Sequence, residues 1–296
     1  MAKLRGAGGT EVPSVPPASA PSLVSTISLP VFDASAKAVD NRRKIVVDRD
    51  SLRKSGYLPD KGTERKFADY YRQIKRPLIT RAAGPAVAGR ANPRLIMLAS
   101  ALPGDGKTFT SINLALSMAR EHDVSVVLVD ADVPKPHISR LFGIDKEPGF
   151  LDALADDSVD VESLILPTDV PGLSILPSGK PHEGATELLA SARMAKLAGR
   201  LCAHDARRVA ILDSPPLLVS SESRALCAVA GQIVLVVCSG KTPRHAVVDA
   251  LDQLDNRESV FLVLNQSHAS SAESYYGYGG SYYAQDTRDD SPKHDS

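Results

Sequence analysis

Six short apolar runs divide the chain between residues 94 and 267. Each has the length and composition of a strand buried in a sheet, and segments with apolar residues at helical spacing separate them. The predicted strands are Leu95–Ser100, Ser125–Asp130, Leu173–Leu176, Arg208–Asp213, Gln232–Cys238 and Val260–Leu264. The predicted helices span residues 108–121, 184–204, 222–230 and 243–256, with shorter ones near 137–142 and 149–155.

This alternation of strand and helix predicts an α/β fold in which a mostly parallel sheet carries helices on both faces. The order of the strands within the sheet cannot be read from the pattern. Before this region, residues 44–60 hold a short strand-like run followed by a turn or short helix, and residues 63–80 predict one helix that ends near Pro77.

The two ends of the chain lack an apolar period and are rich in small and polar residues. We therefore expect four parts. They are a disordered arm over 1–43, an N-terminal helical and linker segment over 44–93, a core domain over 94–267 and a flexible tail over 268–296. The tail holds five of the eight tyrosines, namely Tyr275, Tyr276, Tyr278, Tyr282 and Tyr283.

The net charge of zero argues against a nucleic-acid binder that works by bulk charge. It hides an asymmetry, because residues 1–94 carry 18 Lys/Arg against 8 Asp/Glu, whereas residues 95–296 carry 17 against 27. Attraction between the two halves, within a molecule or between copies, is the favoured interpretation. The alternative is that the basic arm meets an anionic membrane surface or an acidic partner.

Cysteine usage and hydropathy place the chain in a reducing cytosol. Cys202, Cys227 and Cys238 are widely spaced, so they indicate neither a disulfide framework nor a metal site. No apolar stretch approaches the roughly 20 residues of a membrane span, and the N-terminus has no apolar signal core. Any membrane role is therefore expected to come through a partner.

The loop ALPGDGKT lies between a predicted strand and a predicted helix, which is the context of a phosphate-binding P-loop. Gly104 and Gly106 let the backbone curl so that its N–H groups face phosphate oxygens. The helix that follows offers its positive N-terminus to the same anion, and Lys107 adds a full charge for the β and γ phosphates. Thr108 offers a hydroxyl to Mg²⁺. Ala101 replaces the first glycine of the usual pattern, so a glycine-rich turn with a chance Lys-Thr is the alternative.

Two further predicted strands end in carboxylates. Asp130 and Asp132 close the second strand in LVDADVPKP, and Asp213 closes another in ILDSPP. Because ligands bind at the carboxyl edge of a parallel sheet, these groups are placed to hold Mg²⁺ or accept a proton. Either motif alone could be an ordinary capped strand end. Together with the loop they predict a P-loop NTPase fold that binds ATP and Mg²⁺.

The runs ALPGDGKT, LVDADVPKP and ILDSPP resemble the three Walker motifs of the bacterial protein-tyrosine kinases, the autokinases of capsule and exopolysaccharide export. LPSGKPHEGATELLAS and the tyrosine-rich tail resemble further parts of these proteins, so that the resemblance covers residues 64–283. Within the family the chain looks most like the stand-alone cytoplasmic form encoded beside exosortase-linked genes.

The resemblance implies a role for each motif residue. Lys107 would contact the β/γ phosphates, and Asp130 would support the metal or act as base for a tyrosine hydroxyl. Thr108, Asp132 and Asp213 would hold Mg²⁺, with Asp132 also counted among the catalytic residues. The nucleotide-binding positions would be Gly104, Asp105, Gly106, Lys107, Thr108, Phe109 and Asn265, the last of them beside the adenine.

It also implies partners and a location. The family needs a membrane chain-length-determinant (Wzz-like) activator, works against a tyrosine phosphatase, and forms homo-oligomers. The chain would thus be cytoplasmic and recruited to the inner membrane by that activator. The family has an oligomerisation pattern Glu-x-x-Arg-x-x-Arg. In this chain the pattern is degenerate, as Asp69-x-x-Arg72-x-x-Lys75. Lys135 stands near an arginine usual after the second acidic motif, and whether it replaces that arginine is open.

The predicted activity is ATP-dependent phosphorylation of the chain's own tail tyrosines, which would regulate exopolysaccharide synthesis. A flexible segment with tyrosines between glycines suits delivery into the site of a neighbouring copy. One alternative is a MinD/ParA-like ATPase switch, but Leu102 stands where those proteins have a signature lysine. The other is a non-catalytic, nucleotide-gated regulator of an export complex.

Overall fold

The structure, a computed structural model, describes residues 43–85, 91–254 and 257–267. In this part of the chain seven strands form one sheet in the order β3-β4-β2-β5-β1-β6-β7. All neighbouring pairs are parallel except β3 with β4, which confirms the predicted α/β fold with a mostly parallel sheet. The strands are β1 Leu95–Ser100, β2 Ser125–Asp130, β3 Leu166–Pro167, β4 Leu173–Leu176, β5 Arg208–Asp213, β6 Gln232–Cys238 and β7 Val260–Asn265.

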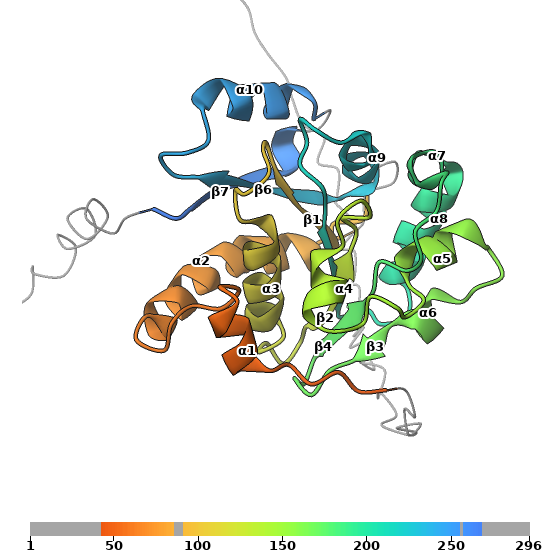
Figure 1. The fold of residues 1–296 in the computed structure, drawn as a ribbon, viewed down its shortest axis with the longest axis horizontal. Coiled ribbons are helices and arrows are strands. Elements are labelled where there is room, and N and C mark those ends of the chain that lie inside the picture. The colour runs from red at the N-terminus through yellow and green to blue at the C-terminus, as the bar shows by residue number, and fades with distance from the viewer. Residues whose placement is uncertain (1–42, 86–90, 255–256, 268–296) are drawn as a thin grey trace, which may run out of the picture. The chain divides into compact units, whose positions relative to one another are not determined.

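Helices cover both faces of this sheet (Figure 1). Along β1, Leu95 and Met97 face the core under α5, α8, α9 and α10, whereas Ile96 and Leu98 face the core under α1 to α4. The alternation follows from the two-residue period of a strand. The helices are α1 Arg49–Lys54, α2 Glu64–Ala82, α3 Lys107–Met118, α4 His137–Leu141, α5 Phe150–Ala155, α6 Val161–Leu164, α7 Ala185–Leu189, α8 Ala192–Leu201, α9 Ser221–Val229, α10 Arg244–Asp252 and the 3₁₀ turn η1 Arg257–Ser259.

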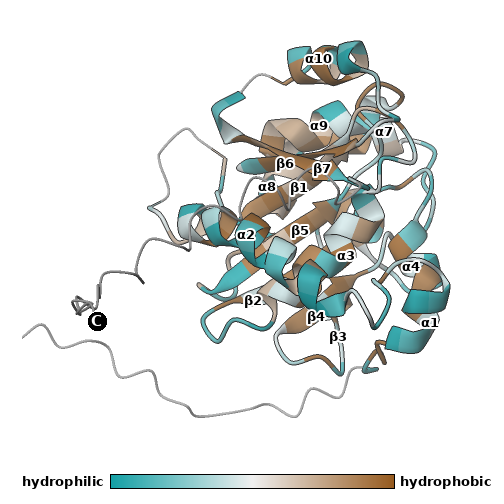
Figure 2. Cartoon of the chain, turned by 90° about the vertical axis from the view of Figure 1, so that its left-hand side faces the viewer, coloured by the Kyte–Doolittle hydropathy of each residue, from teal (hydrophilic) through white to brown (hydrophobic). Residues whose placement is uncertain are grey.

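The segment before β1 shares the core of the sheet. Ile45, Leu52 and Leu78 are buried in the same cluster as the sheet residues Ile96 and Leu98. Figure 2 shows the brown, hydrophobic strands in the interior, with teal positions on α1 and α2 at the surface. The residues predicted as an N-terminal segment and those predicted as the core domain therefore pack as one hydrophobic unit where they are described. Residues 1–42 of the predicted arm lie outside the described residues, as does the tail with its five tyrosines.

The prediction that the second helix ends near Pro77 is wrong, because α2 continues to Ala82. Proline removes one backbone donor from a helix. Here the residues beyond it are anchored by burial, since Leu78 is 1% exposed and Ala82 is 6% exposed. The side chain of Gln232 also donates to the carbonyl of Leu78 at 3.0 Å. Tertiary packing outweighs the local signal.

The single helix predicted over 184–204 is also wrong, because α7 and α8 are separate. Ser191 stands between them with an extended backbone and accepts a hydrogen bond from the N–H of Arg193, which makes it an N-cap. Its hydroxyl donates to the carbonyl of Leu188, at the end of α7. One serine therefore ends one helix and starts the next. The two-residue strand β3 and the short helix α6 carry too little pattern to be predicted.

Candidate active site

The P-loop connects the central strand β1 to α3, and two glycines shape it. Gly104 and Gly106 have φ values of 88° and 97°, in the region that glycine adopts without strain. At Gly106 space is limiting as well, because a Cβ there would lie 2.0 Å from Nδ2 of Asn265. Both glycines that the sequence assigned to the loop are thus required by its backbone.

Side chains from distant elements brace this loop. The carboxylate of Asp105 accepts from the N–H of Leu102 at 3.1 Å and from the hydroxyl of Thr242 at 2.6 Å. The side-chain amide of Asn265 donates to the carbonyl of Asp105 at 2.9 Å. Asp105 and Asn265 were predicted as nucleotide contacts, and their side chains hold the loop in shape. Thr242 was not predicted, although it follows β6 at the edge of the sheet where the loop lies.

The order of the strands explains how the motifs meet. Strand β5 lies between β1 and β2, so the loop after β1 and the carboxylates that end β5 and β2 are neighbours at one edge. Asp130 and Asp213 are paired directly in the register of β2 with β5. The structure therefore brings together the three motifs that the sequence identified separately.

Asp213 is fully buried and is held by α3. Its carboxylate accepts from the hydroxyl of Thr108 at 2.7 Å and from that of Ser111 at 2.8 Å. Burial raises the pKa of Asp213, whereas the Thr108 hydrogen bond and the charge of Lys107 act in the opposite direction. Ser111 was missed by sequence reasoning, and its position three residues after Thr108 on one helix face is the signal that could have found it.

The two carboxylates after β2 occupy different environments. Asp130 is fully buried, and its Oδ2 accepts from the N–H and the hydroxyl of Ser139 at 2.7 and 2.6 Å. Its Oδ1 is buried without a hydrogen-bond partner among the described residues. Burial raises the pKa of Asp130 to about 7, and the nearby Asp213 and Asp132 add to the increase. Asp132 is 8% exposed. Burial raises its pKa, and the positive charge of Lys107 partly offsets this increase.

A cavity of about 590 Å³ opens above these groups and has the size of a small-molecule site. Lys107, Thr108 and Asp132 line it, together with residues of the loop and of the Pro215-Pro216 turn. Tyr57, which precedes α2, also lines it and was not predicted. A second cavity of about 690 Å³ runs along α2 and β7, and Phe109 lines both. Asn265 lines the second cavity only, and Asp130 is absent from both linings.

The donor set fits a magnesium ion. Thr108, Asp132 and Asp213 offer one hydroxyl and two carboxylates, and Mg²⁺ prefers oxygen ligands. Within the described ranges, no group of three or more His, Cys, Asp and Glu side chains gathers closely enough to hold a metal alone. A magnesium ion at this place would thus need other oxygens, from a phosphate and from water, in its shell.

The charged residues that resemble the oligomerisation pattern on α2 form ion pairs within the chain. Arg72 forms an ion pair with Asp69 one turn away. Lys75 is 6% exposed and donates to the carbonyl of Ser117 and to Glu121, both at 2.6 Å. Lys75 therefore fixes α2 against α3, so that its ammonium group is already occupied in the single chain.

Comparison with known proteins identifies the family. A family described as an AAA domain matches residues 93–255. The tyrosine-protein kinase YwqD of Bacillus subtilis is 34% identical over 186 residues, which cover 62% of this chain and 77% of that protein. The chain belongs to the bacterial protein-tyrosine kinases. The predicted family is thereby confirmed, and with it the predicted activity of a tyrosine autokinase of polysaccharide synthesis that uses ATP.

Structures of kinase domains agree with this assignment. The kinase domain of VpsO is 28% identical, with a TM-score of 0.56 over 71% of this kinase and 100% of that chain. The kinase domain of the Escherichia coli tyrosine kinase ETK is also 28% identical, with a TM-score of 0.53 over 64% of this kinase and 72% of that chain. Two putative tyrosine-protein kinases EpsB of Ralstonia are longer, and this kinase spans only 24% and 25% of their lengths. Among the described residues, no helix is both long and apolar enough to cross a bilayer.

Proposed function

We propose that the chain transfers the γ-phosphoryl group of ATP, with Mg²⁺, to tyrosines of its own C-terminal segment, and so regulates exopolysaccharide synthesis. The proposed acceptors are Tyr275, Tyr276, Tyr278, Tyr282 and Tyr283. The observation that carries the proposal is that Lys107, Thr108 and Asp132 line one cavity while Thr108 bonds the buried Asp213. Charge compensation and positioning are what phosphoryl transfer requires of a protein.

Each group has a part in binding. The amides of the loop at Gly104 to Gly106 and the ammonium of Lys107 would hold the β and γ phosphates. Thr108, Asp132 and Asp213 would hold Mg²⁺, which when bound neutralises charge on the phosphates. The nucleoside would lie toward the second cavity, where Phe109 offers an apolar surface and Asn265 a polar one.

We assign the role of base to Asp132 in preference to Asp130. The oxygen of the incoming tyrosine attacks the γ-phosphorus, the bond to the β–γ bridging oxygen breaks, and ADP leaves. The phenolic proton passes to a carboxylate that the tyrosine can reach. Asp132 lines the cavity, whereas Asp130 is fully buried and bound to Ser139. Asp130 would instead position the segment between β2 and α4.

The setting of this activity follows from the family. We propose that a Wzz-like membrane chain-length-determinant protein activates the kinase, recruits it to the inner membrane from the cytoplasm and favours its assembly with other copies. A tyrosine phosphatase would reverse the modification. The stand-alone form beside exosortase-linked genes is the placement we favour within the family.

Mass spectrometry of the purified full chain after incubation with ATP and Mg²⁺ tests the proposal. Phosphate is expected on the five tail tyrosines, and Lys107→Met should lower the rate about 10²- to 10³-fold, because a charge that stabilises the transition state is lost. Lys54→Met, an exposed lysine of α1, is the matched control and should behave as the wild type.

Other results would favour the alternatives. Binding of ATP without phosphotyrosine would indicate a non-catalytic regulator, and release of inorganic phosphate without phosphotyrosine would indicate an ATPase switch. Phosphate found only outside residues 275–283 would contradict the proposed acceptors.

A further inference from the structure

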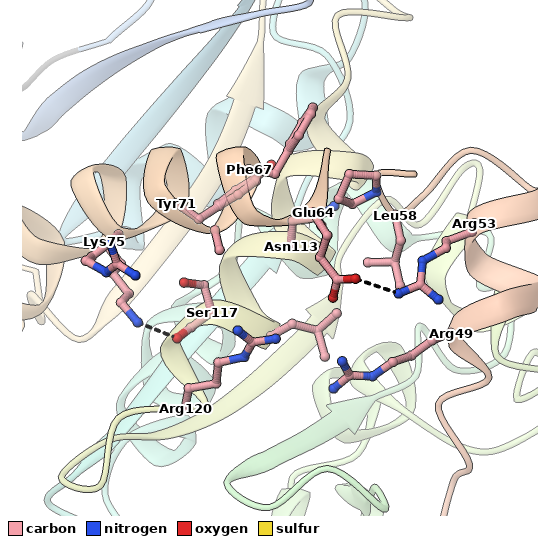
Figure 3. A pocket seen from close by; sticks show the side chains of 14 residues that line it. Arg49, Arg53, Leu58, Glu64, Phe67, Tyr71, Lys75, Asn113, Ser117 and Arg120 are labelled. Atoms are coloured by element: carbon pink, nitrogen blue, oxygen red, sulfur yellow. Dashed lines mark hydrogen bonds and ion pairs between the residues drawn. The ribbon is translucent and has the colours of Figure 1, made fainter. Parts of the chain in front are cut away.

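A third, smaller pocket is polar and lies toward the end of α3 that is remote from the P-loop (Figure 3). It has a volume of about 130 Å³ and is formed by α1, α2 and the residues that end α3. Because α3 has 12 residues and rises about 1.5 Å per residue, roughly 18 Å of helix separates Lys107 from this end. The pocket shares no lining residue with the cavity that holds Lys107 and Asp132, and it shares Phe67 and Tyr71 with the cavity along α2 and β7.

The pocket is strongly basic. Five cationic side chains and a single carboxylate line it, and three of the cations have ion pairs. Arg53 pairs with Asp50 and Glu64, Arg72 pairs with Asp69, and Lys75 pairs with Glu121. The remaining two are Arg49 of α1 and Arg120, which follows α3.

Arg49 and Arg120 are exposed, and neither has a hydrogen-bond or ion-pair partner in the described part of the chain. Figure 3 shows their guanidinium groups directed toward one another from opposite sides of the pocket. On the same side of the pocket as Arg49, Arg53 is directed toward Glu64, and its buried Nε has no hydrogen-bond partner among the described residues. Like charges that face one another cost free energy unless an anion lies between them.

The shape of the pocket restricts which anion fits. Phe67 and Tyr71 of α2 and Leu58 form part of its wall, so an aromatic and apolar surface adjoins the cationic rim. Its volume of about 130 Å³ is below the roughly 300–1,000 Å³ of a cavity that takes a whole small-molecule ligand, so that a phosphate group suits it better than a nucleotide. Arginine binds phosphate oxygens in a bidentate fashion, and arginine clusters recognise phosphorylated peptides.

We infer that this pocket binds the phosphoryl group of a phosphotyrosine, supplied by a phosphorylated tail of this chain. The inference rests on the proposed function, which makes that phosphotyrosine the product of the reaction. Arg49 and Arg120 bind the phosphate from two sides, and Tyr71 and Leu58 form the wall beside them. The recessed shape favours a single phosphorylated side chain over the flat surface of an anionic membrane.

A consequence is that the product is held away from the site that made it. A tail bound at the far end of α3 leaves the cavity of Lys107 free for the next acceptor. The bound tail would thus leave Lys107, Thr108 and Asp132 unobstructed.

A peptide-binding measurement tests the inference. The probe is a fluorescent synthetic peptide of residues 272–284, with its tyrosines either phosphorylated or not, and its anisotropy is measured with the full-length Lys107→Met chain. This background prevents self-modification, so the result does not depend on whether the chain transfers phosphate. The phosphorylated peptide is expected to bind at least tenfold more tightly than the unphosphorylated one.

The double variant Arg49→Gln, Arg120→Gln in the same background should abolish that tenfold preference. Arg244→Gln, an exposed arginine of α10, is the matched control and should keep it. Thermal unfolding of each variant checks that the chain is folded. Inorganic phosphate at millimolar concentration should displace the phosphopeptide, because both would occupy the same guanidinium groups.

Equal affinity for the two peptides, or a preference that survives in the double variant, would overturn the inference. Binding of phosphatidylserine vesicles that depends on Arg49 and Arg120, with no binding of the phosphopeptide, would also overturn it and assign the pocket to a membrane surface. A chain that makes no phosphotyrosine of its own but binds the phosphopeptide would refute the proposed function while leaving the pocket's specificity intact.

Discussion

Gly106 is the residue at which the P-loop turns into α3, and both its backbone and its surroundings exclude a side chain. Its φ is 97°, and Asn265 fills the space where a Cβ would lie. The sequence predicted the glycine from the motif alone. It could not predict the neighbour, because the contact joins residues at opposite ends of the domain. The contact between Asp105 and Thr242 could not be predicted for the same reason.

Gly106→Ala is expected to cost about 1–3 kcal/mol of folding stability, because a non-glycine residue is strained at this φ and the new methyl displaces Asn265. ATP binding should weaken with it. Thermal unfolding and titration with a fluorescent ATP analogue measure the two effects. Gly62→Ala, at an exposed glycine with nothing within 4 Å of an added Cβ, is the control. Equal effects of both substitutions would show that Asn265 does not confine Gly106.

Asp132 and Asp130 should differ sharply when each is changed to asparagine. Asp132→Asn is expected to lower the initial rate of phosphotyrosine formation by about 10²-fold or more, as loss of a general base does. Asp130→Asn should lower it by less than about tenfold, since a buried amide keeps an oxygen for Ser139. Immunodetection of phosphotyrosine over time measures both rates. The reverse order of effects would return the role of base to Asp130.

At the scale of elements, the central strands were predictable because a strand buried on both faces is a continuous apolar run. The ends of helices were less predictable where packing overrides a local signal, as at Pro77, or where a cap such as Ser191 interrupts a periodic segment. The candidate site was predictable as three motifs. Their convergence needed the position of β5 between β1 and β2, which depends on pairings between distant segments.

Lys75 of α2 provides a test at this scale. Lys75→Met should destabilise the chain by about 1–3 kcal/mol, because the carbonyl of Ser117 and the carboxylate of Glu121 lose their partner at the contact between α2 and α3. Arg76→Met, an exposed cation on the same helix, should change stability little. Chemical unfolding measures both. If Lys75→Met left stability unchanged and altered only the size of an assembly, the side chain would belong to a subunit contact.

At the scale of the whole molecule, charge is separated along the chain. Residues 1–94 are basic in sum and residues 95–296 are acidic. An unmodified chain therefore has two segments of opposite net charge, through which copies can attract one another. Each phosphotyrosine adds about −1.5 to −2 charges to the acidic part. Phosphorylation of the tail consequently increases the repulsion between the acidic parts of neighbouring copies.

We expect unmodified copies to assemble and phosphorylated copies to separate. Light scattering after size-exclusion chromatography should show a lower molar mass after incubation with ATP and Mg²⁺ than before. Lys107→Met should keep the same mass in both conditions. Identical masses for the phosphorylated and unphosphorylated wild type would refute this coupling between modification and assembly.

The hydrogen bond from Asn265 to Asp105 connects the last described strand with a loop 160 residues earlier. A chain is made from its N-terminus, so the ribosome releases the loop long before the asparagine that braces it. A nascent chain that stops before β7 already contains all three Walker motifs. Its P-loop still lacks the hydrogen bond from Asn265 to the carbonyl of Asp105. Tight binding of ATP is therefore expected only after β7 has joined the sheet.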